Sequence, residues 1–164
     1  WIDVSSFPAT GEGAARIERM AIHNSKTGSS GLHFSGGEPL EIALEVITKG
    51  HLRSPIIATD VRDARGNLIF GLNTYFLEGK MLELFPASRI RVRFSFHMPL
   101  LLNGKYSFSA AIADGSYEQH PQHQVINEPI LCEVTSFDLP RRHYLLCLES
   151  ACFDVERVSV ERVS

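Results

Sequence analysis

Asp60, Arg62 and Asn73 are the polar residues with the clearest chemical use, within the segment ATDVRDARGNLIFGLNT at residues 58–74. Asp60 and Arg62 are two residues apart, so an extended chain directs both side chains to the same side. A carboxylate accepts hydrogen bonds from hydroxyl groups, and guanidinium and amide groups donate to hydroxyl or ring oxygens. This combination suits a sugar. The alternative is a solvated strand face, with an ion pair that contributes about 0–1 kcal/mol.

The motifs of several common catalytic sites are absent from the sequence. A nucleotide-binding loop of the form G-x4-G-K-[ST] needs a hydroxyl residue after Lys80, and the segment GLNTYFLEGKM at 71–81 also has the wrong spacing. No serine lies in a G-x-S-x-G elbow. Asp60 and Asp63, three residues apart along a strand, face opposite sides and cannot readily flank one glycosidic bond. We therefore expect no enzymatic activity and no cofactor.

The sequence HPQH supplies His120 and His123, and Cys132 follows downstream, as a possible fragment of a metal site. Cys132 falls on the inward side of its expected strand, and no fourth ligand has a recognisable spacing. We therefore interpret the histidines as loop residues near the surface and expect no metal. The three cysteines, Cys132, Cys147 and Cys152, suit reduced thiols better than a disulfide framework.

Length and composition indicate one globular domain. The chain has 164 residues, of which 44% are hydrophobic and 21% charged. A formal net charge of -3 disfavours nucleic acid as a partner. The apolar run MPLLL at 98–102 is far shorter than the roughly 20 residues of a membrane span, so we expect a soluble protein. We expect residues 1–12 to be a linker or lead-in, and 13–164 to be a single domain.

Hydrophobic and polar residues alternate with a period of two through most of the chain, which is typical of half-buried β-strands. Turn-forming Gly, Asn and Asp residues separate the alternating runs. Seven strands are predicted, at residues 14–23, 40–46, 55–63, 67–74, 89–98, 104–113 and 129–136. We therefore predict an all-β fold, an immunoglobulin-like antiparallel two-sheet β-sandwich.

A second polar surface combines the outward side chains of residues 89–98 with carboxylates of residues 40–46. The residues are Arg89, Arg91, Arg93, His97, Glu41 and Glu45. We interpret this surface as cross-strand charge pairing between neighbouring strands. The alternative is a basic stripe that docks an acidic partner.

The order and spacing of five segments resemble a known family. The segments are GAARIERMAIHN (13–24), FSGGEPLEIALEV (34–46), SPIIATDVRDARGNLIFGLNT (54–74), RIRVRFSFHMPLLLNGKYSFSAAIAD (89–114) and QVINEPILCEV (124–134). Together they resemble the C-terminal carbohydrate-binding domain of Wzt-type proteins, the nucleotide-binding subunits of ABC transporters that export O-antigen polysaccharide in Gram-negative bacteria. The hairpin DARGNLIFGLNT is the best motif. Where such domains often carry an aromatic residue before the final strand, this chain has His123.

The resemblance implies a non-catalytic domain that binds the exported glycan, commonly at its modified non-reducing end. It implies an N-terminal ATPase domain in the same parent chain, a transmembrane transporter subunit as partner, and a cytoplasmic location at the inner membrane. Family members also look like homodimers that exchange a C-terminal strand, and the tail 141–164 is expected to supply extra or swapped strands.

The predicted site lies on one sheet, if the strands 55–63, 67–74, 104–113 and 129–136 are neighbours. Small outward Ser and Ala side chains then form a shallow trough between longer polar ones, with Ile69 also facing outward. The candidate carbohydrate-binding residues are Asp60, Arg62, Asn73, Ser107, Ser109 and Glu133, with Tyr117 and His123 at the rim.

Two alternatives to a sugar-binding trough remain open. The first is an immunoglobulin-like structural or dimerisation domain whose Ser/Ala trough is a protein interface. The second is a degenerate glycoside hydrolase, for which Asp60 and Glu133 are the pair of carboxylates to consider.

Overall fold

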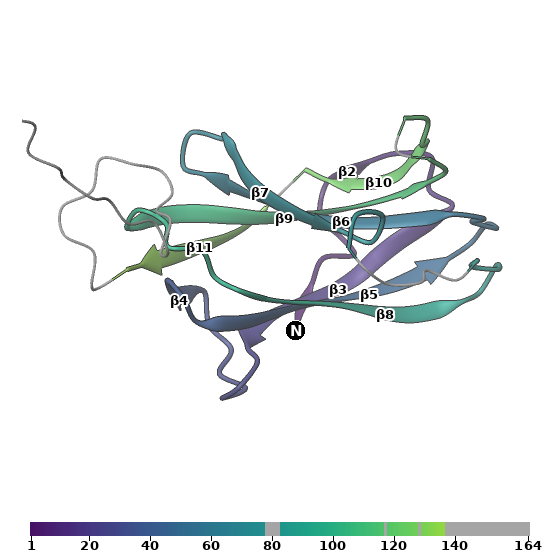
Figure 1. Ribbon diagram of the computed structural model, residues 1–164. Helices are drawn as coiled ribbons and strands as arrows, with labels where there is room; N and C mark the ends of the chain where they lie inside the picture. The colour runs from purple at the N-terminus through teal and green to yellow at the C-terminus, as the bar shows by residue number, and fades with distance from the viewer. Residues whose placement is uncertain (78–82, 117, 128, 137–164) are drawn as a thin grey trace, which may run out of the picture.

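Two packed layers of strands make up the part of the chain that the computed structural model describes, residues 1–77, 83–116, 118–127 and 129–136 (Figure 1). The strands are Ile2–Asp3 (β1), Ala9–Thr10 (β2), Ala15–Asn24 (β3), His33–Ser35 (β4), Pro39–Thr48 (β5), Pro55–Asp63 (β6), Leu68–Asn73 (β7), Arg89–His97 (β8), Gly104–Asp114 (β9), Gln122–Ile126 (β10) and Ile130–Thr135 (β11).

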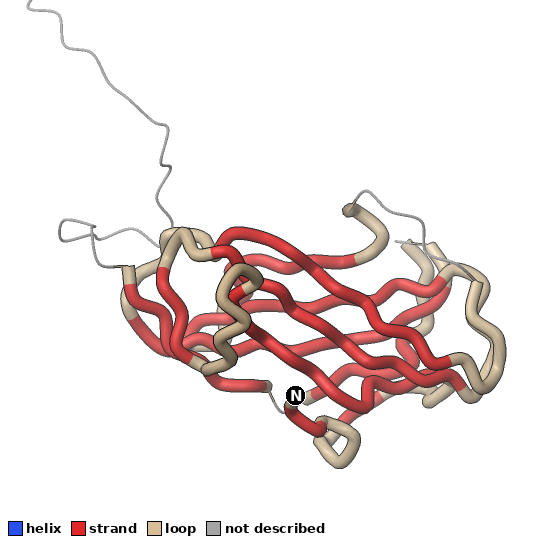
Figure 2. Tube along the Cα trace, turned by 90° about the horizontal axis from the view of Figure 1, so that it is seen from below, coloured by secondary structure: helices blue, strands red, loops and turns tan. Residues whose placement is uncertain are grey.

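The described ranges contain strands, turns and loops but no helical residue (Figure 2). A helix long and apolar enough to span a bilayer is accordingly not found among these residues. All strand pairs are antiparallel except β4 with β11. The predicted all-β, two-sheet β-sandwich is confirmed.

The four-stranded sheet has the order β1-β3-β5-β8. Strand β5 lies between the long strands β3 and β8 along nearly its full length. Because side chains alternate along a strand, Leu44 is fully buried in the core while its neighbours Ala43 and Glu45 belong to the outer face. A β-bulge in β3 adds Glu18 to the strand, so Glu18 and Arg19 both lie on that outer face.

Strand β9 is the centre of the seven-stranded sheet. Strand β6 pairs with one edge of β9 along residues 106–114, and β11 and β10 follow one another along the other edge, opposite residues 104–108 and 111–113. Strand β7 extends β6, β4 extends β11, and β2 extends β10. The sequence prediction that four strands share one sheet is therefore confirmed for β6, β7, β9 and β11.

The core lies between the sheets and consists of the inward side chains of both. Phe108 of β9 is fully buried, and its ring meets that of Phe34 edge-on, with the ring centroids 6.1 Å apart. Ile17, Ile42 and Ile57 add fully buried side chains from β3, β5 and β6. Because burying apolar surface contributes about 25 cal/mol per Å², these residues determine which side of each strand remains outside.

Four strands, β1, β2, β4 and β10, fall outside the sequence prediction. Residues 1–12, expected as a linker or lead-in, contain β1 and β2, which pair with β3 and β10. Val4, between these two strands, is buried in the core. Strands of two or three residues are too short to show a period of two, and the sequence QHQVI of β10 is too polar to stand out. The tail 141–164 lies outside the described residues.

Cys132 of β11 lies in the core opposite Tyr106 of β9. Burial raises the pKa of the Cys132 thiol to about 12, and a hydrogen bond from the Tyr106 backbone opposes this shift. A thiol with this pKa is ionised in only about one molecule in 10⁴ at pH 8. The thiolate is the reactive form, so Cys132 should react slowly.

We expect Cys132 to resist a disulfide-type thiol reagent at pH 8 in the folded protein. The measurement uses a Cys147→Ser/Cys152→Ser variant, in which Cys132 is the remaining cysteine. The same variant in denaturant is the control and should release one equivalent of product. Fast labelling without denaturant would contradict the buried position of Cys132.

Candidate functional site

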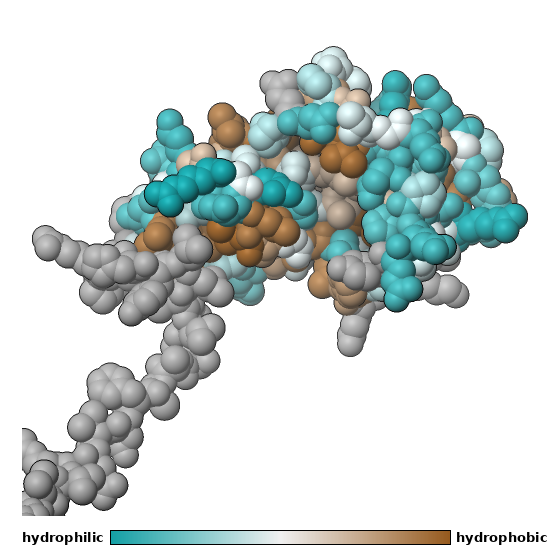
Figure 3. All heavy atoms as spheres, turned by 90° about the horizontal axis from the view of Figure 1, so that it is seen from above, coloured by the Kyte–Doolittle hydropathy of each residue, from teal (hydrophilic) through white to brown (hydrophobic). Residues whose placement is uncertain are grey.

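The outer face of β6, β7, β9 and β11 brings several predicted carbohydrate-binding residues together. Asp60 of β6 lies opposite Ser109 of β9, and Arg62 lies opposite Ser107. Leu131 of β11 is the neighbour of Ser107 on the other side. Ser107 therefore lies between two longer side chains, whereas Ser109 has a paired neighbour only on the β6 side. Figure 3 views the molecule from the side of this sheet, where hydrophilic and hydrophobic residues lie next to each other.

Asp60 and Arg62 form an open ion pair on this face. Arg62 Nη2 and Asp60 Oδ2 are 3.5 Å apart, and both side chains are about two-fifths exposed. Arg62 Nη1 also donates to the carbonyl oxygen of Gly66 at 3.1 Å, which directs the side chain toward the β6–β7 turn. Gly71 lies opposite Asp60, and a Cβ atom there would lie 2.8 Å from Asp60 Oδ1. The glycine thus leaves space beside the carboxylate.

Asn73 ends strand β7 and lies opposite Ala58 of β6. Its Oδ1 accepts hydrogen bonds from the backbone N–H groups of Tyr75 at 3.0 Å and Phe76 at 2.9 Å. Such a side-chain-to-backbone turn fixes the chain direction after the strand. The side-chain oxygen is therefore engaged in the turn, and the Nδ2 group is the part of Asn73 that can donate to a ligand.

A β-bulge between β6 and β7 changes which apolar residue faces outward. The register shift places Leu68, and not Ile69, opposite Arg62. Ile69 packs against the core, so the expectation that it faces outward is wrong. Leu68 is 55% exposed and Leu131 is 65% exposed. A row across the four strands therefore consists of Leu68, Arg62, Ser107 and Leu131.

Glu133 lies on the same sheet but far from Asp60. Glu133 is opposite Lys105 of β9, whereas Asp60 is opposite Ser109, four residues further along that strand. At about 3.3 Å per residue, this offset alone is about 13 Å. Glycosidase carboxylates lie about 5–9.5 Å apart. The two residues therefore cannot flank one glycosidic bond, and Glu133 instead neighbours His33, with 3.7 Å between Oε2 and Nδ1.

His123 is not the exposed loop residue that the sequence predicts. It is the extra residue of a β-bulge in β10, between Gln122 and Gln124, and only 8% of it is exposed. The N–H of Gly13 donates to the His123 carbonyl oxygen at 2.9 Å, so the N-terminal segment covers the bulge. The Nδ1 atom of His123 lies 3.8 Å from Glu12 Oε2, and only 9% of the His123 side chain is exposed. Tyr117, the other expected rim residue, lies outside the described residues.

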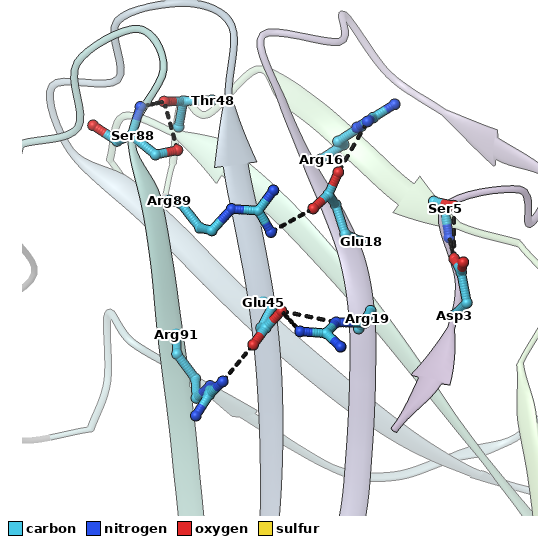
Figure 4. Close-up of polar contacts among 10 residues, drawn as sticks. All are labelled: Asp3, Ser5, Arg16, Glu18, Arg19, Glu45, Thr48, Ser88, Arg89 and Arg91. Atoms are coloured by element: carbon cyan, nitrogen blue, oxygen red, sulfur yellow. Dashed lines mark hydrogen bonds and ion pairs between the residues drawn. The ribbon is translucent and has the colours of Figure 1, made fainter.

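Glu45 organises the outer face of the four-stranded sheet (Figure 4). Its carboxylate accepts hydrogen bonds from Arg19 of β3 and Arg91 of β8, each at 2.5 Å, and only 6% of its side chain is exposed. These hydrogen bonds from Arg91 and Arg19 lower the pKa of Glu45, against the opposing effect of burial. The indole of Trp1 lies over both guanidinium groups, at 4.9 Å from Arg91 and 5.2 Å from Arg19.

Two further glutamates on this face also contact basic side chains, and Glu41 has His23 of β3 at 3.7 Å as one of its partners. Glu18 lies 3.0 Å from Arg16 and 2.7 Å from Arg89. Glu41 is 3.4 Å from the Nε atom of Arg93. The predicted cross-strand charge pairing is therefore confirmed for Arg91 with Glu45 and for Arg93 with Glu41, whereas Arg89 reaches past β5 to Glu18 of β3.

No candidate metal centre is found in the described ranges, where no group of three or more His, Cys, Asp or Glu side chains could hold an ion. The residues of the sequence fragment are also separated in the structure. The Nδ1 atom of His120 lies 2.9 Å from the carbonyl oxygen of Ser116, whereas Cys132 is buried in the core.

The sandwich and its two polar outer faces define a β-sandwich module. Residues 8–143 match the family model described as "Wzt C-terminal domain". The chain therefore belongs to the Wzt C-terminal domain family, and the resemblance based on its sequence motifs is confirmed.

Solved structures support the same fold. The "Crystal structure of the C-terminal domain of wzt" aligns with a TM-score of 0.79 at 16% identity, covering 93% of this chain and 96% of the other. A Niemann-Pick type C2 protein from Japanese carpenter ant aligns with a TM-score of 0.51 at 8% identity, covering 79% of this chain and 98% of the other. No curated protein sequence matches the chain. At these identities the structural likeness is one of fold.

We expect Glu45→Gln to lower the free energy of unfolding at pH 7. At acidic pH the difference from the unsubstituted protein should become small. A carboxylate whose pKa is lowered by folding stabilises the folded state above its unfolded pKa, near 4.5, and this contribution disappears as the pH falls through the folded pKa. The measurement is urea unfolding of both proteins at pH 7, 5 and 3, followed by circular dichroism.

Glu133→Gln is the matched control, because Glu133 is exposed and lies 3.7 Å from its partner His33. We expect it to differ little from the unsubstituted protein at each pH. A Glu45→Gln difference that is equally large at pH 7 and pH 3 would show that the charge of Glu45 does not stabilise the fold.

Proposed function

We propose that this domain binds a polysaccharide without changing it chemically and thereby supports O-antigen export by an ABC transporter. Membership of the Wzt C-terminal domain family supports the transporter role. The observation that carries sugar binding is the row Leu68, Arg62, Ser107 and Leu131, beside Asp60 and Ser109, on the seven-stranded sheet.

The chemistry of this face suits a sugar. Asp60 provides two acceptor oxygens, and Arg62 provides planar donors that match hydroxyl and ring oxygens. The exposed side chains of Leu68 and Leu131, at the two ends of the row, offer apolar surface to the C–H groups of separate sugar rings of a polymer. Ser107 lies between them and is small enough for a ring to approach the sheet.

The expected affinity is modest. A neutral hydrogen bond contributes about 0.5–1.5 kcal/mol net, and one to a charged group about 1.5–3 kcal/mol. A shallow face that makes a few such bonds holds a polymer by several weak contacts. A modest affinity also allows release of the glycan during export.

The proposed setting follows from the family. The parent chain carries an N-terminal ATPase domain, which works with a transmembrane transporter subunit at the cytoplasmic face of the inner membrane. The domain itself is non-catalytic and functions as a homodimer. Neither nucleic acid nor a cofactor takes part in this function.

The second candidate function is a protein interface on the same face. The two exposed leucines, Leu68 and Leu131, favour this alternative, because both would lose solvent-exposed apolar surface if a protein covered the row. The trough would then hold a second copy of the domain rather than a sugar.

We expect Asp60→Ala to weaken retention of the source strain's O-polysaccharide at least about tenfold, because it removes charged hydrogen-bond acceptors. Ser109→Trp should block the trough sterically. The measurement is affinity electrophoresis or glycan-column retention of the purified domain, with circular dichroism to confirm that each variant is folded.

Ser95→Trp is the matched control, because Ser95 is exposed on the outer face of β8 in the opposite sheet. It should retain the polysaccharide. Unchanged binding by both Asp60→Ala and Ser109→Trp would refute the proposed site. If Ser109→Trp instead separates a dimer while glycan binding survives, the trough is a protein interface.

A further inference from the structure

A groove of about 680 Å³ lies on the outer face of the four-stranded sheet, on the side of the sandwich opposite the trough. Ala21 of β3 and Ala43 of β5 line it and lie opposite each other in the sheet. Trp1 and charged residues of β5 and β8 also line it, together with the loop before β4. The volume lies within the range of about 300–1,000 Å³ that is typical of small-molecule sites.

The groove exists because two short side chains lie between rows of long ones. The row of Arg19, Glu45 and Arg91 crosses the sheet on one side of the alanines. Glu41 lies on the other side, two residues along β5 from Ala43. The long charged side chains therefore form the walls of the groove, and the two alanines form its floor.

Trp1 supplies an aromatic surface beside this opening. Its cation–π contacts with Arg19 and Arg91 hold the indole against the sheet, yet 52% of the residue is exposed. Binding sites for small molecules commonly combine such an aromatic surface with a few fixed polar groups. The sequence did not identify Trp1 as a site residue, because it falls in the expected linker or lead-in.

Positive charge is in excess on this face. Strands β3, β5 and β8 carry five arginines and three glutamates, although the whole chain has a net charge of -3. Asp3 of β1, at the sheet edge, adds a fourth carboxylate, because hydrogen bonds from Ser5 lower its pKa and keep it charged, and five arginines against four carboxylates leave one net positive charge. An anionic ligand is therefore favoured over a neutral or cationic one.

Arg93 is the lining arginine best placed to bind an acidic group. Arg91 is fixed by its 2.5 Å hydrogen bond to Glu45. Arg93 instead contacts Glu41 loosely, at 3.4 Å through Nε, and about half of its side chain is exposed. Arginine binds carboxylate and phosphate groups through paired N–H donors, so a ligand acid can engage the outer edge of Arg93.

We propose that this groove is a second binding site, which takes an acidic sugar residue. The sugar ring lies against Trp1, and its carboxylate or phosphate binds Arg93. The inference rests on the proposed function in one respect, that the acidic sugar belongs to the bound polysaccharide. An acidic peptide could also form ion pairs with the arginines. The exposed indole ring of Trp1 beside two alanines, however, fits the flat face of a sugar ring better.

The test uses Trp1 as its own probe, because it is the one tryptophan in the sequence. Tryptophan fluorescence is titrated with glucuronate and glucose 6-phosphate, which distinguish a carboxylate from a phosphate, and with glucose as the neutral match. We expect a saturable change with at least one acid and none with glucose. Added salt should weaken the response, because the charges are partly exposed.

Arg93→Gln and Arg89→Gln form a matched pair for the titration. Both arginines lie on the outer face of β8 and pair with one glutamate, but only Arg93 lines the groove. We expect Arg93→Gln to weaken the response at least about tenfold and Arg89→Gln to preserve it. Equal responses of the two variants, or a response to polyglutamate without one to either acidic sugar, would overturn the proposal.

These experiments test the proposed function of the trough and the proposed groove site independently. If the polysaccharide is retained but no acidic sugar changes the Trp1 fluorescence, the groove proposal is wrong and the proposed function stands. If Trp1 responds to an acidic sugar but the domain retains no polysaccharide, the groove binds acids and the proposed function is wrong.

Discussion

The position of strand β9 is the constraint on which the seven-stranded sheet depends. One edge of β9 pairs with β6 over nine residue positions, from Pro55 with Asp114 to Asp63 with Tyr106, and its other edge holds β11 and β10 in turn. Phe108 faces the core, so Ser107 and Ser109 must face outward. A slip of one residue would exchange the two sets, burying the serines and exposing the phenylalanine. The packing of the core therefore also fixes the composition of the trough.

The two outer faces follow from one rule but differ in chemistry. Small outward residues lie beside long polar ones on both sheets. On the four-stranded sheet, Glu45 is nearly buried, and two arginine hydrogen bonds offset the cost of removing its charge from water. On the other sheet, Asp60 and Arg62 remain open to solvent with a long contact. On the four-stranded sheet, ion pairs fix the charged side chains to one another. On the seven-stranded sheet, Asp60 and Arg62 stay accessible to solvent.

Long strands were predictable from the sequence, because a period of two over six or more residues reflects one buried and one exposed side. The two-residue strand β1 shows no period, and its pairing with β3 depends on contacts distant in sequence. Bulges account for the errors in side-chain direction. One extra residue in β10 buries His123, and a register shift in the β6–β7 hairpin replaces Ile69 by Leu68 on the outer face.

The thickness of the sandwich determines how the two faces can act together. Packed sheets lie about 10 Å apart, so the trough and the groove are separated by at least that distance and cannot contact the same sugar ring. A polymer can still reach both by bending around a sheet edge, or two segments can bind one to each face. Rigidly linked weak sites raise retention through effective concentration without tightening either site. If both proposed sites bind the glycan, it would leave stepwise, because each contact breaks at modest cost, whereas a single deep site of equal affinity would have to release it in one event.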